Sequence, residues 1–171
     1  MPTLCVRLLE LPNVKSIGLE CFEAAITAGS PMSMAHKREM QALTGNSLYE
    51  LWGLTEGVAT IIDPVDMASH YSTVGRPMLG CDIRIIDEDD QDITFKGSGE
   101  IVGHAGTLMS GYWNREDANQ ALIWKDEFEG VFIRTGDIGE FDSDGFLTLR
   151  GRKKDMIISG GVNVFPVDIE T

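Results

Sequence analysis

Residues 130–152 read GVFIRTGDIGEFDSDGFLTLRGR, and this order of apolar, glycine and acidic residues predicts the architecture of the second half of the chain. The apolar run predicts a strand, TGDIG predicts a loop, and DSDG predicts the tight turn of a hairpin. Asp137 would then lie at a strand end, where its carboxylate could accept two hydrogen bonds from a vicinal diol such as a ribose. A turn aspartate that caps its own backbone is the alternative.

The segments that precede this hairpin continue the pattern. CDIRIID (81–87) and GEIVGHAG (99–106) predict two strands. NREDANQALI (114–123) predicts a short helix capped by Asn114, with Asp117 three positions on. Many short strands in one stretch indicate a small β-barrel or a curled sheet.

Residues 1–70 are of a different type and predict an α/β arrangement. EAAITAG (23–29) predicts a short strand that ends in Gly29, and SMAHKREMQALTG (33–45) predicts a helix between an N-cap at Ser33 and a stop at Gly45. SLYELW (47–52) and VATII (58–62) predict two further strands around the string GLTEG. The fold class expected is therefore α/β followed by β.

The composition excludes several classes of partner. The chain has 171 residues and a formal net charge of −13, so it lacks the generic basic face that nucleic acids and anionic membranes require. It contains no apolar run of membrane-spanning length and no leader, so we expect a cytoplasmic protein without stable membrane insertion. Cys5, Cys21 and Cys81 are far apart and indicate neither a disulfide framework nor a metal site.

The string ELWGLTEG (50–57) contains a candidate site. A strand that ends in Gly-x-Thr-Glu-Gly turns sharply and exposes a hydroxyl and a carboxylate side by side. Thr55 could bond a phosphate oxygen, Glu56 could hold Mg²⁺, and Trp52 offers a flat face on which a purine can stack. A plain turn with solvated side chains is the commoner meaning of so short a string.

Two further candidates lie near the end of the sequence. LRGRKKD (149–155) places four cations together in an acidic chain, and one of them could reach the same phosphate or ribose. A solvated basic face is the alternative. Gly160 and Gly161 permit a close approach of the backbone to a ligand, or form an ordinary turn between a strand and a helix.

The order of these segments is more specific than any one of them. GSPMS, LWGLTEG, GEIVGHAGTLMSGYWN, RTGDIG and GRKKDMIISGGVNVFPVDIE resemble successive motifs of the adenylate-forming superfamily, and together they span residues 29–170. Its members are acyl-CoA and aryl-CoA synthetases, peptide-synthetase adenylation domains and beetle luciferases. The last motif looks most like the acid–CoA ligase branch.

The resemblance implies a two-step reaction with ATP, Mg²⁺ and coenzyme A. A carboxylate attacks the α-phosphate of ATP to give acyl-AMP and pyrophosphate, and the thiol of coenzyme A then displaces AMP. By position, Trp52 would stack on adenine, where family members often have Tyr. Gly29, Ser30 and Pro31 would line the adenine pocket.

The remaining roles also follow from the resemblance. Thr55 would contact phosphate and Glu56 would bind Mg²⁺, while Asp137 would accept the ribose hydroxyls and Arg152 would support ribose or phosphate. Trp52, Glu56 and Asp137 are thus expected to share one cleft. Lys154 would be the hinge between a large and a small domain, and Gly160 and Gly161 would help to build the CoA channel.

The resemblance finally implies a domain organisation. Residues 1–70 would be the C-terminal part of the large-domain α/β subdomain, residues 71–150 its distorted β-barrel subdomain, and residues 151–171 the hinge and the start of the small domain. The family's phosphate loop and its small-domain catalytic lysine have no counterpart in the sequence, so we expect an internal piece that is inactive alone and that self-associates, for instance as a homodimer. The alternatives are a peptide-synthetase-type adenylation domain that loads a carrier protein and a non-catalytic nucleotide-binding module.

Overall fold

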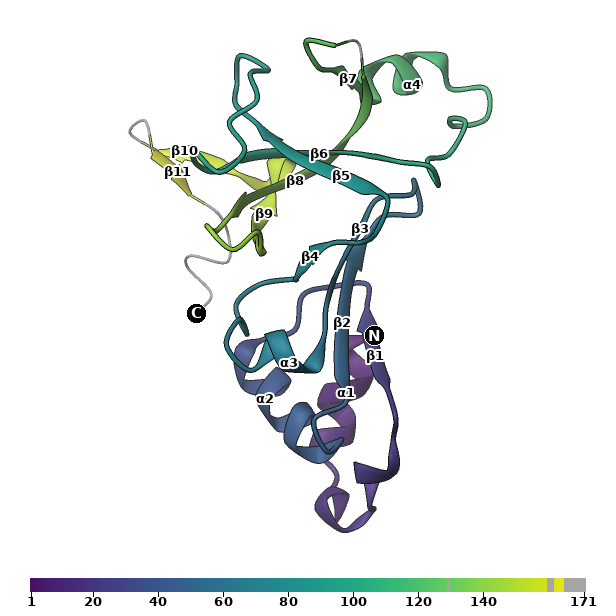
Figure 1. Cartoon of the computed structure of the whole chain (residues 1–171), viewed down its shortest axis with the longest axis vertical. Helices are drawn as coiled ribbons and strands as arrows, with labels where there is room; N and C mark the ends of the chain where they lie inside the picture. Colours follow the sequence, from purple (N-terminus) through teal and green to yellow (C-terminus); the bar gives the residue numbers. More distant parts are fainter. Residues whose placement is uncertain (129, 160–161, 165–171) are drawn as a thin grey trace. The chain divides into compact units, whose positions relative to one another are not determined.

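The chain divides between a mixed α/β unit and a β-rich unit (Figure 1). In this computed structural model the described residues are 1–128, 130–159 and 162–164. The first unit consists of Met1–Gly53 and Ala59–Met78, and the second of Leu54–Val58 and Leu79–Thr171. The loop at residues 54–58 thus belongs to the β-rich unit, although it connects two strands of the other. The three-part organisation inferred from the sequence stays a prediction.

A four-stranded sheet organises the first unit, in the order β1 (Ala25–Ala28), β2 (Leu48–Gly53), β3 (Ala59–Ile62) and β4 (Arg76–Pro77). The pair β1–β2 is parallel and the other pairs are antiparallel. Side chains alternate across β2, so that Leu48, Glu50 and Trp52 are buried. The unit also contains α1 (Pro2–Leu9), η1 (Val14–Ser16), η2 (Leu19–Cys21), α2 (Met34–Leu43) and α3 (Pro64–Met67).

Helix α2 begins and ends where the sequence predicts. The hydroxyl of Ser33 accepts the His36 N–H at 3.3 Å as the N-cap. After the helix, Gly45 adopts a left-handed φ of +64°, which a glycine takes without steric cost. The apolar face is weak because two of its buried positions are polar, Lys37 and Gln41.

These two polar side chains bind groups of neighbouring segments. The Lys37 ammonium donates to the Thr73 carbonyl at 2.9 Å and forms an ion pair with Glu50, and both charged side chains are almost fully buried. Gln41 donates to the Pro64 carbonyl at 2.9 Å and accepts the Leu48 N–H at 2.9 Å. The helix is therefore fixed to the unit by directed polar contacts as well as by Met40 and Leu43.

An antiparallel sheet builds the second unit, with the order β5 (Cys81–Ile86), β6 (Gly99–Ala105), β8 (Val131–Phe141) and β7 (Ile123–Lys125), and with β9 (Leu147–Arg152) paired to β8. Register shifts interrupt both the β6–β8 and the β8–β9 pairing, and such bulges bend and twist a sheet. The expected fold class, α/β followed by a curled β-sheet, is confirmed. The unit also contains α4 (Glu116–Leu122), η3 (Lys153–Asp155), β10 (Ile157–Ser159) and β11 (Val162–Val164).

Two local predictions are wrong. Strand β8 continues through TGDIG without a loop, so Asp137 lies within the strand and not at its end. The chain passes Gly136 with φ of +71° and a bulge at Ile138 and Gly139, which the sequence pattern could not distinguish from a loop. Asn114 does not cap α4, because it adopts a left-handed φ of +52° and Arg115 occupies the N-cap position.

The buried ion pair of the first unit generates a prediction. Lys37→Met should lower the free energy of unfolding by about 3–5 kcal/mol, because it leaves the Glu50 carboxylate buried without a cation. The double variant Lys37→Met/Glu50→Gln should recover part of this loss, since the amide oxygen still accepts the Met32 N–H. Urea denaturation measures both values.

The matched control is Arg76→Met, which breaks the exposed pair of Arg76 with Asp66. An exposed pair contributes about 0–1 kcal/mol. If Lys37→Met and Arg76→Met lower the free energy of unfolding equally, the buried pair does not stabilise the unit more than an exposed pair does.

Candidate functional site

The TEG turn, residues 55–57, is closed by two backbone bonds within the second unit. The Leu54 N–H donates to the Val58 carbonyl at 2.9 Å, and the Gly57 N–H donates to the Leu54 carbonyl at 3.1 Å. Thr55 is exposed and Glu56 is half-buried. The turn therefore presents a hydroxyl and a carboxylate at the surface, as the sequence predicts.

A second segment of the same unit, residues 107–112, holds this turn. The Met109 N–H donates to the Glu56 carbonyl at 2.9 Å, and the Thr107 hydroxyl donates to the Gly57 carbonyl at 2.8 Å. Gly57 has φ of +115°, and a Cβ atom there would lie 2.3 Å from the Thr107 carbonyl oxygen. Only glycine fits so close a backbone contact.

The carboxylate of Glu56 accepts hydrogen bonds at both oxygens. The Tyr112 hydroxyl donates to Oε1 at 2.6 Å, and the Thr55 hydroxyl donates to Oε2 at 3.2 Å. The bond from Tyr112 is the main cause that lowers the pKa of Glu56; partial burial opposes it, while the residue's own N–H, Thr55 and the positive charge of Arg152 add to it. Glu56 is therefore ionised at neutral pH and retains lone pairs for a further ligand.

Asp137 and Arg152 face each other across β8 and β9. They are register partners, and Arg152 Nε lies 2.8 Å from Asp137 Oδ1. The Asp137 side chain is 10% exposed, whereas that of Arg152 is 50% exposed. The positive charge of Arg152 makes the smallest contribution to the lowered pKa of Glu56, so Arg152 is linked both to Asp137 and to the TEG turn.

The residues predicted to bind adenine lie near the C-terminal ends of β1 and β2 in the first unit. Parallel strands end at the same edge, and Ala28 of β1 is the register partner of Leu51 in β2. Gly29 and Trp52 follow these two residues, and Ser30 and Pro31 are exposed beyond Gly29. The Met32 N–H donates to Glu50 Oε1 at 3.0 Å, which ties this segment to β2. Because Trp52 and Asp137 belong to different units, their shared cleft stays a prediction.

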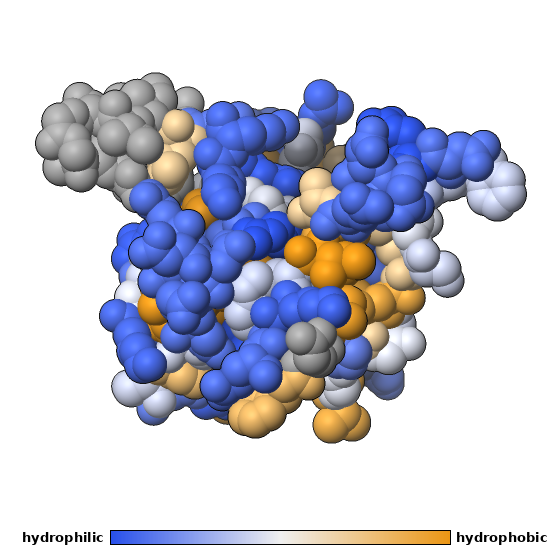
Figure 2. Space-filling view, turned by 90° about the horizontal axis from the view of Figure 1, so that it is seen from above, coloured by the Kyte–Doolittle hydropathy of each residue, from blue (hydrophilic) through white to orange (hydrophobic). Residues whose placement is uncertain are grey.

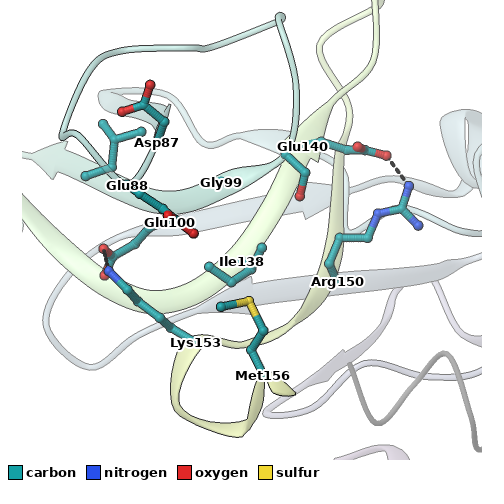
Figure 3. Close-up of a pocket in the computed structure, with 11 residues that line it drawn as sticks. Asp87, Glu88, Gly99, Glu100, Ile138, Glu140, Arg150, Lys153 and Met156 are labelled. Atoms are coloured by element: carbon teal, nitrogen blue, oxygen red, sulfur yellow. Dashed lines mark hydrogen bonds and ion pairs between the residues drawn. The ribbon is translucent and has the colours of Figure 1, made fainter. Parts of the chain in front are cut away.

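A cavity that the sequence does not indicate is lined by Lys153, the residue before the predicted hinge residue Lys154. Lys154 is exposed in η3, while Gly160 and Gly161 lie outside the described residues. A cavity of about 450 Å³ opens beside β8 and η3, and Figure 3 shows, among the residues that line it, Lys153 directed at Glu100 and Arg150 at Glu140. Lys153 Nζ lies 2.8 Å from Glu100 Oε2, so η3 is anchored to β6 by an ion pair.

The described residues offer carboxylates but no clustered metal site. Residues 1–128, 130–159 and 162–164 contain no group of three or more His, Cys, Asp or Glu side chains that could hold a metal ion. Glu56 nevertheless suits Mg²⁺, which is commonly bound by one or two carboxylates together with substrate phosphates and water. Over the same ranges, no helix is long and apolar enough to cross a membrane.

Three of these contact residues were missed by sequence reasoning. Glu50, Lys37 and Tyr112 contact predicted site segments through side chains that come from distant parts of the sequence. Tyr112 does stand inside the motif GEIVGHAGTLMSGYWN, so membership of a motif was the one available signal.

Comparison with known proteins gives a consistent result. The family described as AMP-binding enzyme matches residues 1–113. A long-chain-fatty-acid–CoA ligase of Yersinia pestis is 33% identical over 98% of the chain and 29% of its own length. The long-chain-fatty-acid–CoA ligase FadD13 of Mycobacterium tuberculosis is 34% identical over 100% of the chain and 33% of its own length.

Solved structures agree with these relatives. The amide bond synthetase McbA from Marinactinospora thermotolerans has a TM-score of 0.89 at 27% identity. The match covers 99% of the present chain and 34% of the McbA chain. ATP-bound MatB from Rhodopseudomonas palustris has a TM-score of 0.84 at 28% identity, with 99% and 33% covered. The chain thus spans about a third of the length of the proteins that it matches.

The close contact at Gly57 generates a prediction. Gly57→Ala should lower the free energy of unfolding by about 2–4 kcal/mol, because its Cβ collides with the Thr107 backbone and φ is positive. Gly80→Ala is the matched control, since Gly80 has φ of +85° but nothing within 4 Å of the added Cβ. It should cost about 1 kcal/mol. Thermal unfolding measures both, and equal shifts would show that the contact with Thr107 does not constrain the turn.

Proposed function

Because the chain belongs to the family of AMP-binding enzymes, we propose that it is part of an ATP-dependent, AMP-forming acid–CoA ligase. The resemblance inferred from five ordered motifs is confirmed by this family match and by CoA-ligase relatives over the whole chain. The proposed substrates are a long-chain fatty acid or another carboxylic acid, ATP and coenzyme A. The observation that carries the proposal is the joint placement of Glu56, Asp137 and Arg152 in one unit.

The proposed reaction has two balanced steps. An oxygen of the acid attacks the α-phosphorus of ATP, the bond to pyrophosphate breaks, and acyl-AMP forms. The thiolate of coenzyme A then attacks the acyl carbonyl, and AMP leaves with the electrons of the cleaved C–O bond. Both steps place negative charge at phosphate oxygens, which preorganised donors and cations stabilise.

Each residue of the chain has a part in this proposal. Asp137 accepts the ribose hydroxyls and holds Arg152 by its ion pair, so that the exposed guanidinium edge can donate to ribose or phosphate. The Thr55 hydroxyl donates to a phosphate oxygen. Glu56 holds Mg²⁺, which when bound offsets charge on the phosphates. The ring of Trp52 stacks on adenine.

Three segments complete the proposed site. Gly29, Ser30 and Pro31 line the adenine pocket. Lys154 is the hinge residue, and it lies one position after Lys153, which is anchored to Glu100. Gly160 and Gly161 contribute to the CoA channel, in the region predicted as the start of a small domain.

A second candidate has support from the comparisons. One similar structure is an amide bond synthetase, so an amine could replace coenzyme A as the acceptor of the acyl group. A peptide-synthetase-type adenylation domain uses a carrier protein as the acceptor in the same step. A non-catalytic module would bind nucleotide without exchanging pyrophosphate into ATP. Supplying coenzyme A or an amine separately to the acyl-adenylate distinguishes the acceptors.

We further propose a cytoplasmic, self-associating protein, most simply a homodimer. Figure 2 shows apolar patches interspersed on a largely hydrophilic face. The apolar residues Leu4, Ile26 and Trp113 are 65%, 68% and 89% exposed. Burial of such side chains against a second copy would be favourable.

The test of function uses a chimera in which residues 1–171 replace the matched segment of a CoA-ligase relative. We expect acid-dependent exchange of pyrophosphate into ATP, and thioester formation with coenzyme A. Asp137→Asn should lower kcat/KM about 10- to 100-fold, since a hydrogen bond to a charged group contributes about 1.5–3 kcal/mol. The chain alone should give no exchange.

Asp144→Asn is the matched control, because Asp144 is an exposed carboxylate in the turn of the same hairpin. It should leave the exchange rate unchanged. A chimera that folds and binds ATP but exchanges no pyrophosphate would overturn the ligase assignment, and equal losses in both variants would remove Asp137 from the site.

A further inference from the structure

Tyr112 contacts the candidate site at Glu56, and the resemblance assigns no role to this tyrosine. Its hydroxyl donates to Glu56 Oε1 at 2.6 Å, across 56 positions of sequence. The residue itself is 39% exposed, so the hydroxyl is not buried in a core. A donor–acceptor distance of 2.6 Å is typical of a bond from a neutral hydroxyl to a carboxylate.

The backbone of Tyr112 is itself clasped by helix α4. The Tyr112 N–H donates to Asn119 Oδ1 at 2.7 Å, and Asn119 Nδ2 donates to the Tyr112 carbonyl at 3.0 Å. Gly111 has φ of +128°, and an added Cβ would lie 3.1 Å from Asn119 Oδ1. The position of the Tyr112 backbone, from which the ring extends, is thus set by two reciprocal hydrogen bonds and a tight turn.

The same segment also fixes the main chain of Glu56. The Met109 N–H donates to the Glu56 carbonyl, and Tyr112 donates to the carboxylate three positions later. A side chain held at its backbone and at its tip has fewer rotamers available before any ligand arrives. Such preorganisation reduces the entropy that binding must otherwise overcome.

We propose that Tyr112 is a positioning residue that fixes the Glu56 carboxylate in the orientation required to bind a divalent cation together with nucleotide phosphates. This inference rests on the proposed function, because Glu56 has a cation to hold only if ATP binds at the TEG turn. Tyr112 acts through Glu56 and touches neither cation nor nucleotide. Asn119 supports it by holding the Tyr112 backbone.

The test removes the hydroxyl and reads the conformation of Glu56 directly. In the unchanged chain, the three-bond NMR couplings of Glu56 should report one side-chain rotamer. Tyr112→Phe should average them, while the Met109–Glu56 backbone bond keeps the turn folded. Tyr71→Phe is the matched control, since it removes a phenol hydroxyl from the other unit, and it should leave the Glu56 couplings unchanged.

The second readout is the affinity for Mn²⁺ in the presence of ATP, measured by electron paramagnetic resonance. Tyr112→Phe should weaken this affinity about tenfold, as is usual when a partner of a metal ligand is lost. In a Glu56→Gln background, Tyr112→Phe should have no further effect, because the group that it positions is gone.

Each outcome decides a separate question. Three results would overturn the positioning role. The first is averaged Glu56 couplings in the unchanged chain, and the second is an unchanged Mn²⁺ affinity in Tyr112→Phe. The third is that Tyr112→Phe lowers the Mn²⁺ affinity equally in the Glu56→Gln background. A single Glu56 rotamer that Tyr112→Phe releases supports it. If the unchanged chain shows that rotamer but binds no Mn²⁺ with ATP, the positioning of Glu56 stands and the proposed nucleotide site fails.

Discussion

The ion pair between Asp137 and Arg152 is the interaction on which the candidate site depends. Asp137 lies inside β8 among buried residues, and a carboxylate in that position requires a paired cation or hydrogen-bond donors. The hairpin supplies the cation, because its turn at residues 142–145 and the bulge after Ile138 place Arg152 opposite Asp137. The charge of the same guanidinium also helps to lower the pKa of Glu56, although the hydrogen bond from Tyr112 is the main cause of that shift.

The sequence predicted those features that short-range rules govern. Ser33 caps α2 and the DSDG string turns the hairpin, because caps and turns depend on a few adjacent residues. The same rules failed in β8, where Gly136 and Gly139 suggested a loop. Both glycines allow a strand to twist and allow neighbouring backbone to approach closely. Only the pairing of β8 with β6 and β9 shows that these glycines lie in a strand and not in a turn.

The side chains that hold the site together could not be predicted, because their partners are distant in sequence. Lys37 belongs to a polar helix face that suggests solvent, yet its ammonium is buried against Glu50 and the Thr73 carbonyl. Tyr112 is exposed in a loop, and nothing in its neighbourhood indicates Glu56 as its acceptor. Residue type gave the chemistry of the candidate site, but only three-dimensional packing identifies what orients each group.

The charge distribution limits how a chain of net charge −13 can bind a polyanion. Several cations of the second unit lie against carboxylates, as Arg84 does against Asp82 and Lys153 against Glu100. Arg152 also has a carboxylate partner, and about half of its side chain remains in solvent, as does that of Lys153. Attraction at a distance is therefore weak, and in the proposed site the affinity for a nucleotide would come from directed donors and from a cation at Glu56. The orientation of that single carboxylate then matters more than the number of basic residues nearby.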